Sequence, residues 1–180
     1  IVVIGGGFAG VYCTREAERA LRRSENTRIA LIAEENYMVF QPMLAEVAGG
    51  ALSPRHVVNP LRLLCRRADI LKGTVESIDW PGRTLTVFAG PLAGRVTVRF
   101  RQLVVSLGAV IDLRRIPGMP EHAFLVQNVG DAMLLRSTLV SRMEEANLER
   151  RPEGSKRLLT FVVVGGGYSG AETAGQLIDL

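Results

Sequence analysis

The sequence predicts an α/β fold with a parallel β-sheet, an inserted antiparallel β-meander and the start of a second α/β unit. Three observations support this prediction. A short apolar run, Ile1 to Ile4, precedes the motif Gly5-Gly6-Gly7-Phe8-Ala9-Gly10. The same arrangement returns where Phe161 to Val164 precede Gly165-Gly166-Gly167-Tyr168-Ser169-Gly170. Between the two motifs, residues 73–101 alternate between apolar and polar side chains, as strands of an antiparallel sheet do.

Both glycine motifs follow the pattern G-x-G-x-x-G, which is typical of a loop that binds a dinucleotide. The first glycine permits a tight turn from strand to helix, the second lets the backbone approach a pyrophosphate, and the third lets helix and strand pack closely. The pyrophosphate then lies on free amide groups at the helix N-terminus. One such motif alone is weak evidence. Two copies, each between an apolar strand and a helix-forming stretch, predict two Rossmann-type units with two dinucleotide sites.

The first unit continues with a helix predicted from Val11 to Arg23 and a parallel strand predicted from Arg28 to Ala33. Together they complete a strand-helix-strand unit, for which a right-handed crossover is expected. An acidic residue at the end of the second strand typically accepts hydrogen bonds from the ribose hydroxyls of the adenosine half and repels a 2′-phosphate. Glu34 is predicted to have this role. Glu35 is the alternative, because a strand end is located only to within a residue or two.

The segment from Asn36 to Gly50 is rich in apolar side chains. These side chains either form the wall beside a planar ring system or pack in the core, and composition does not separate the two. Pro60 suits the first position of a short helix.

The meander and the strand after it are read from alternation and turns. Three antiparallel strands are predicted at Thr74–Asp79, Arg83–Val87 and Arg95–Phe100, with turns at Pro81-Gly82 and Gly90-Pro91. Leu103 to Gly108 then returns as a buried apolar strand. A glycine at its end lets the chain pass close to a bulky group such as a bound cofactor.

A linker is predicted at Pro117-Gly118-Met119-Pro120, and a helix from Asp131 to Leu148. The helix has one apolar face at helical spacing, which indicates packing rather than a partner surface. It is predicted to end at residues 151–154. Residues 1–115 are therefore expected to form the N-terminal part of the first nucleotide-binding domain. Residues 116–180 are expected to contain the linker helix and the truncated start of the second, so the chain is predicted to be a fragment.

The amino-acid composition argues against several classes of function. The net charge of +4 and the pI of about 9.6 come almost wholly from arginine, since Lys72 and Lys156 are the only lysines. The arginines are scattered in pairs without a basic stripe and interleaved aromatics, which argues against nucleic-acid binding. No apolar run approaches the ~20 residues that span a bilayer. Cys13 and Cys65 lack the spacing of a metal site or a redox pair, so both are expected to be structural thiols and no metal site is predicted.

The order of these elements resembles the FAD-dependent pyridine nucleotide-disulfide oxidoreductase superfamily. Within it, two segments resemble the type II NADH dehydrogenases, the single-chain NADH:quinone oxidoreductases. They are Asn36-Tyr37-Met38-Val39-Phe40-Gln41-Pro42-Met43-Leu44 and Leu52-Ser53-Pro54. Ile116-Pro117-Gly118 and Gly167-Tyr168-Ser169-Gly170-Ala171-Glu172 fit this family too.

The resemblance implies that the first motif binds FAD and the second binds NAD(P)H. It implies cofactor-binding roles for Gly5, Gly7, Ala9 and Gly10 at the FAD diphosphate, Glu34 at the ribose, Gln41 and Pro42 near the flavin, Val75 through its backbone at the adenine, Gly108 at a close approach to the cofactor, and Gly165, Gly167 and Gly170 at the pyrophosphate of the nicotinamide nucleotide.

The resemblance also implies a catalytic role for Glu172, close to the flavin and the nicotinamide, where it orients them or influences proton movement. The alternative is a glutamate in the first turn of a helix that the helix dipole favours without any function. Hydride transfer itself needs no acid or base, since the cofactors carry that chemistry.

The activity implied is a respiratory-chain flavoprotein that passes a hydride from NAD(P)H to FAD and electrons on to a quinone. The protein is expected to lie peripherally on the cytoplasmic face of a membrane through a C-terminal part that this sequence does not contain. The isolated 180 residues are expected to be incomplete for activity. Residues that would distinguish NADH from NADPH are expected ~20 residues after the second motif, and the sequence does not indicate an oligomeric state.

Two alternatives stay open, a reductase on the same scaffold with a protein acceptor and a non-catalytic flavin- or nucleotide-binding redox module. Disulfide reductases need a close cysteine pair beside the flavin, and residues 42–50 contain no cysteine. Neither Cys13 nor Cys65 matches the cysteines of sulfide:quinone reductases.

Overall fold

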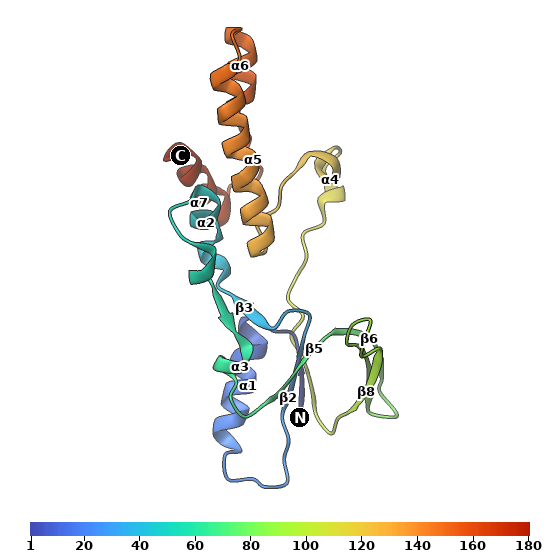
Figure 1. The fold of residues 1–180 in the computed structure, drawn as a ribbon. Helices are drawn as coiled ribbons and strands as arrows, with labels where there is room; N and C mark the ends of the chain where they lie inside the picture. The colour runs from blue at the N-terminus through green and yellow to red at the C-terminus, as the bar shows by residue number, and fades with distance from the viewer. The chain divides into compact units, whose positions relative to one another are not determined.

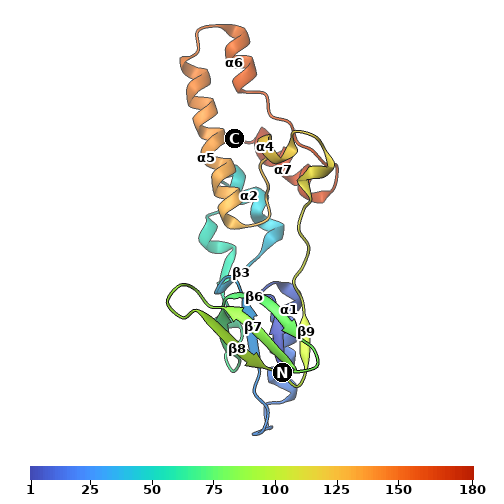
Figure 2. The ribbon, with the colours of Figure 1, turned by 90° about the vertical axis from the view of Figure 1, so that its right-hand side faces the viewer.

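The computed structural model describes residues 1–180 and divides into two compact units (Figures 1 and 2). Unit 1 comprises residues 1–38 and 59–111, and unit 2 comprises residues 39–58 and 112–180. The predicted boundary between residues 115 and 116 separates two cofactor-binding domains. The division into compact units does not test that boundary, which stays a prediction.

Unit 1 is built on a four-stranded parallel sheet with the strand order β5-β2-β1-β9. Its strands are β1 (Val2–Ile4), β2 (Ala30–Ala33), β5 (Asp69–Lys72) and β9 (Leu103–Val105). Val3 of β1 lies opposite Leu31 on one side and Val104 on the other. The prediction of an α/β fold with a parallel sheet is thus confirmed. β5 is not evident from the sequence, because Ile70 and Leu71 are its only apolar residues.

Each face of the parallel sheet has its own core cluster. Val3 and Leu31 pack with Val11 of helix α1 (Phe8–Ala20). Val2 and Ile4, whose side chains alternate with that of Val3, pack on the opposite face with residues of the meander. Burial on both faces explains why β1 and β2 are continuous apolar runs.

The meander is a three-stranded antiparallel sheet in the order β6-β7-β8. Its strands, β6 (Thr74–Asp79), β7 (Thr84–Phe88) and β8 (Arg95–Arg99), confirm the predicted meander to within a residue or two at each end. Leu85 and Val87 alternate with exposed or partly exposed neighbours and are buried against the parallel sheet. The short helix α3 (Leu61–Leu64) is present as predicted, but it begins one residue later, with Pro60 as its N-cap and not as its first residue.

Unit 2 is helical. Its helices are the 3₁₀ turns η1 (Gln41–Met43), η2 (Pro54–His56) and η3 (Leu113–Arg115) and the α-helices α2 (Leu44–Gly49), α4 (Met119–His122), α5 (Val129–Leu148), α6 (Pro152–Leu158) and α7 (Tyr168–Ile178). α2 packs on α5 through a buried cluster that includes Leu44, Val47 and Ala132. The short strands β3 (Tyr37–Val39) and β4 (Val58–Pro60) pair with each other and belong to neither unit alone, because residues 37–38 and 59–60 lie in unit 1 and residues 39 and 58 in unit 2.

Helix α5 begins where a capping box closes its N-terminus. The side chain of Asn128 accepts a hydrogen bond from the Asp131 amide at 2.9 Å, and the Asp131 carboxylate accepts one from the Asn128 amide at 3.2 Å. These bonds satisfy amides that the helix itself leaves unpaired. The helix predicted at Asp131–Leu148 is confirmed, with two further residues at its start.

Three details of unit 2 differ from the sequence predictions. The predicted linker 117–120 contains part of helix α4, which Gly118 precedes with a φ of +83°. Helix α5 ends at Leu148, before the predicted residues 151–154, and Pro152 in that segment is the first residue of the new helix α6. The predicted strand Phe161–Val164 pairs with no other strand, and its side chains are 36 to 81% exposed. A strand needs a neighbour for its backbone hydrogen bonds, and unit 2 places none beside it.

None of the helices is long and apolar enough to cross a bilayer.

Candidate functional site

The loop between β1 and α1 can accommodate only glycine at its first position. Gly5 has a φ of +108°, and its amide donates a hydrogen bond to the Ile32 carbonyl at 2.8 Å. A Cβ atom on Gly5 would overlap the backbone carbonyl of Ser106. The left-handed backbone and the close neighbour both exclude a side chain.

The third glycine of this loop is fixed by packing. Gly10 is buried in the first turn of α1, and a Cβ atom there would overlap the Gly5 carbonyl. The helix therefore lies directly against the turn that precedes it. This contact is the close helix–strand approach expected of the third glycine in a dinucleotide loop.

The second glycine borders open space. Gly7 is the N-cap of α1 in an extended conformation (φ −80°, ψ −170°), and no atom lies within 4 Å of where its Cβ would be. No side chain caps this helix, and Gly7 and Ala9 are both exposed. An uncapped N-terminus of a 13-residue helix, bordered by glycine, has the geometry that a phosphate group requires.

The second loop repeats this geometry in unit 2. Gly165 has a φ of +118°, and Gly167 is the N-cap of α7 with φ −77° and ψ 179°. A Cβ atom on Gly170 would overlap the Gly165 carbonyl. One difference is that nothing lies within 4 Å of a Cβ built on Gly165. Two segments far apart in the sequence thus form the same glycine turn into a helix.

Ser106, which no sequence motif marks, supports the first loop. Its hydroxyl donates a hydrogen bond to the Ile4 carbonyl at 2.6 Å, and its amide donates to the same oxygen at 2.8 Å. The end of β1 is thereby held to the chain that leaves β9. The only signal in the sequence was a polar residue inside the apolar run Leu103 to Gly108.

Glu34 and Glu35 follow the end of β2 and differ in their surroundings. The Glu35 carboxylate lies 3.6 Å from the Lys72 ammonium group. Glu34 is exposed and has no hydrogen-bond or ion-pair partner. Of the two candidates, Glu34 is the carboxylate left available for a ligand.

Val75 and Gly108 are the other predicted residues in unit 1. Val75 lies in β6 next to an irregularity in the pairing with β7. Its side chain packs against the core cluster that contains Val2 and Ile4. Gly108 follows β9 with a φ of +73° and open space around it. The positive φ accounts for the glycine locally, and its role near a cofactor stays a prediction.

Gln41, Pro42 and Glu172 belong to unit 2. The Gln41 side-chain amide donates a hydrogen bond to the Gln127 carbonyl at 3.1 Å, and Pro42 is exposed beside it. Glu172 is the fifth residue of α7, exposed and without a partner. The prediction placed it in the first turn, where α7 has no acidic residue. The helix dipole therefore accounts less well for Glu172, because its effect falls off beyond the first turn.

The two cysteines are not paired with each other. Burial, with a smaller contribution from the negative charge of Glu18, raises the pKa of the Cys65 thiol to about 11. Such a thiol stays neutral and unreactive near neutral pH, which supports a structural role. No group of three or more histidine, cysteine, aspartate or glutamate side chains is placed to hold a metal ion.

Two glycine loops of one geometry prompt a comparison with known proteins. The family model of the pyridine nucleotide-disulphide oxidoreductases matches residues 1–180. The chain belongs to this family. Its similarity extends over both loops and over the meander between them.

Curated relatives are similar over essentially the whole of this chain. It is 33% identical over 183 residues to the type II NADH:quinone oxidoreductase Ndh of Mycobacterium tuberculosis, covering 100% of this chain and 38% of that protein. It is 30% identical over 188 residues to the mitochondrial external alternative NADH-ubiquinone oxidoreductase of Yarrowia lipolytica, covering 99% of this chain and 31% of that protein. The chain therefore spans about a third of the length of these relatives.

Solved structures agree on the fold. NDH2 from Plasmodium falciparum in complex with RYL-552 has a TM-score of 0.86 at 22% identity, covering 99% of this chain and 36% of that one. The sulfide:quinone oxidoreductase of Aquifex aeolicus has a TM-score of 0.65 at 23% identity, covering 83% of this chain and 32% of that one. These similarities confirm the α/β fold that the sequence predicts.

Proposed function

We propose that this protein is a FAD-dependent oxidoreductase that passes a hydride from NAD(P)H to flavin and electrons on to a quinone. The observation that carries the proposal is the pair of glycine loops, since each leaves an uncapped helix N-terminus bordered by an exposed glycine. A protein that moves hydride between two dinucleotides needs two such sites. Family membership and the names of the relatives support the same reading.

The residues of the first loop fit FAD. The backbone at Gly7 and Ala9, with the positive end of α1, would hold the diphosphate. Gly5 and Gly10 keep this turn tight, because a Cβ atom at either position would overlap backbone. The unpartnered Glu34 carboxylate would accept hydrogen bonds from the ribose hydroxyls. Val75 would offer its backbone to the adenine, and Gly108 would leave room for the cofactor.

The second loop would hold NAD(P)H in the same way. Gly165 and Gly170 maintain the turn, and Gly167 leaves the backbone accessible to the pyrophosphate. Gln41 and Pro42 would lie near the flavin, with Gln41 held by its bond to the Gln127 carbonyl. The free carboxylate of Glu172 would orient the nicotinamide or carry a proton. When bound, the flavin supplies the chemistry that accepts a hydride and releases electrons.

The quinone acceptor and the place of action rest on the relatives. Their names specify quinone or ubiquinone as acceptor, and that of the Yarrowia lipolytica relative specifies the mitochondrion. We place the protein peripherally on the cytoplasmic face of a membrane, where a quinone dissolved in lipid is accessible.

Anaerobic stopped-flow absorbance of the purified protein tests the proposal. NADH is added first, followed by a soluble quinone. We expect NADH to bleach a flavin band near ~450 nm and quinone to restore it. Bleaching without recovery would replace the quinone with a protein or disulfide acceptor. If no flavin binds even after reconstitution with FAD, the enzyme reading is wrong and a binding module remains.

A further inference from the structure

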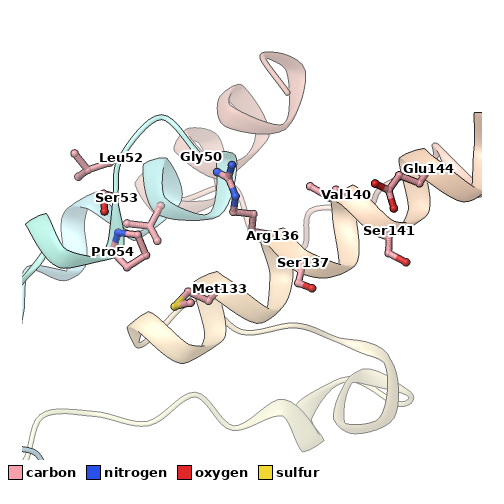
Figure 3. Close-up of a pocket in the computed structure, with 11 residues that line it drawn as sticks. Gly50, Leu52, Ser53, Pro54, Met133, Arg136, Ser137, Val140, Ser141 and Glu144 are labelled. Carbon is pink, nitrogen blue, oxygen red and sulfur yellow. The ribbon is translucent and has the colours of Figure 1, made fainter.

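A groove in unit 2 lies between helix α5 and the chain that follows α2 (Figure 3). It has a volume of about 720 Å³. From α5 it is lined by side chains at helical spacing, which are Met133, Arg136, Ser137, Val140, Ser141 and Glu144. The opposite wall runs from Val47 to Pro54. None of these residues belongs to the glycine loops or to the flavin contacts proposed above.

The groove combines an apolar surface with hydroxyl groups. Of its apolar residues, Val47 is buried, and Met133 and Val140 are 51% and 39% exposed. Ser53 lines one wall, and Ser137 and Ser141 line the other, where the Ser141 hydroxyl lies 3.5 Å from the Glu145 carboxylate. Partly exposed apolar side chains next to hydrogen-bonding groups are the usual composition of a small-molecule site.

Arg136 provides a positive charge that no carboxylate neutralises. Its guanidinium group lies against Gly50, and a Cβ atom on Gly50 would overlap it. Gly50 ends α2 with a φ of +86°, so the cation lies near the negative end of that helix. Arg136 forms no ion pair. In contrast, Arg142 on the same helix lies 3.1 Å from the Glu145 carboxylate.

Glu144 places a negative charge at the other end of the α5 wall. It follows Arg136 by two helical turns, or about 12 Å along the axis at ~1.5 Å per residue. Figure 3 shows Arg136 reaching toward Gly50, with Glu144 farther along α5. The groove therefore favours a negative charge at the Arg136 end and disfavours one at the Glu144 end.

We propose that this groove binds an amphipathic monocarboxylate. The carboxylate pairs with Arg136, and the apolar body lies along Val140 on the side of Arg136 that faces Glu144. The site requires neither FAD nor a quinone, so the proposal is independent of the proposed function.

Equilibrium dialysis of the full protein with radiolabelled decanoate, decanedioate and decanol tests this site. Arg136→Gln removes the unpaired cation, and Arg136→Lys keeps its charge. Arg142→Gln is the matched control, because it removes one positive charge from the same helix outside the groove. The urea midpoint of each variant shows whether the fold is intact.

We expect Arg136→Gln to bind decanoate about threefold to fivefold more weakly, the range of an exposed ion pair. Arg136→Lys should recover part of the affinity, and Arg142→Gln should bind as the unaltered protein does. Decanedioate and decanol should both bind more weakly than decanoate. Equal binding of decanol and decanoate, or equal losses in Arg136→Gln and Arg142→Gln, would overturn the proposal.

Discussion

Two adjacent glutamates show how single residues differ in what they can bind. Glu35 has its charge partly neutralised by Lys72, whereas Glu34 has no partner and leaves both carboxylate oxygens free. An exposed ion pair such as that of Glu35 contributes little to stability, about 0–1 kcal/mol. Glu34 makes no ion pair within the fold, so both of its carboxylate oxygens remain available to a ligand.

Replacing Glu34 with arginine should weaken FAD retention about tenfold or more, because the ribose loses charge-assisted hydrogen bonds and meets a cation. The ratio of flavin to protein absorbance after gel filtration measures the effect. Glu35→Gln is the control and should retain flavin as the unaltered protein does. Normal flavin content in Glu34→Arg would show that the ribose contact is assigned to the wrong residue.

Because the pKa of Cys65 is raised in the folded chain, we expect the free energy of unfolding to depend on pH above neutrality. Burial raises its pKa to about 11 in the folded chain, while a free thiol titrates near ~8.5. The unfolded state therefore loses its proton first, and the folded state loses stability as the pH rises through this interval. Urea unfolding between pH 8 and about 11 should show a smaller decline for Cys65→Ala than for the unaltered protein. Parallel curves for the two proteins would contradict this assignment.

The glycine turn that leads into a helix is the element that defines the candidate site. Both copies have a glycine at positive φ, an extended N-cap glycine and a third glycine in contact with the first. Within each turn the glycines have different tasks. The first and third maintain the backbone path, and the second leaves space for a ligand.

Gly5→Ala and Gly7→Ala should separate these tasks. Gly5→Ala adds strain at positive φ and a clash with the Ser106 carbonyl, so we expect a loss of about 2–4 kcal/mol in the free energy of unfolding. Gly7→Ala should change stability by less than about 1 kcal/mol yet weaken FAD retention, because its methyl group enters the space before the helix. Urea unfolding and flavin content measure the two effects. Equal stability of the two variants would contradict the geometry at Gly5.

At the scale of the whole molecule, the two glycine loops differ in what surrounds them. β1 pairs with β2 on one side and β9 on the other. Phe161–Val164 occupies the corresponding place before the second loop and has no paired neighbour. The same local sequence pattern thus gives a core strand in unit 1 and an exposed, unpaired segment in unit 2.

Hydrogen exchange of the chain of residues 1–180 should show this difference. Amides of Val2–Ile4 should be protected, because the strand is buried and paired on both sides. Amides of Val162–Val164 should exchange far faster. Mass spectrometry of peptic peptides that cover each segment measures both. Similar protection of the two segments would mean that residues 161–164 pair with a strand in solution.

The sequence by itself determined the features that depend on short stretches of chain. Glycine spacing predicted both turns, alternation predicted the meander, and helical spacing predicted α5. It did not predict β5, α6 or the support that Ser106 gives to the first loop. Only the tertiary structure decided that Glu34 rather than Glu35 is free, that Phe161–Val164 is unpaired and that Arg136 borders a groove. The reason is physical: turn and strand propensities act between near neighbours, whereas pairing, burial and charge neutralisation depend on residues that the fold brings together from distant parts of the chain.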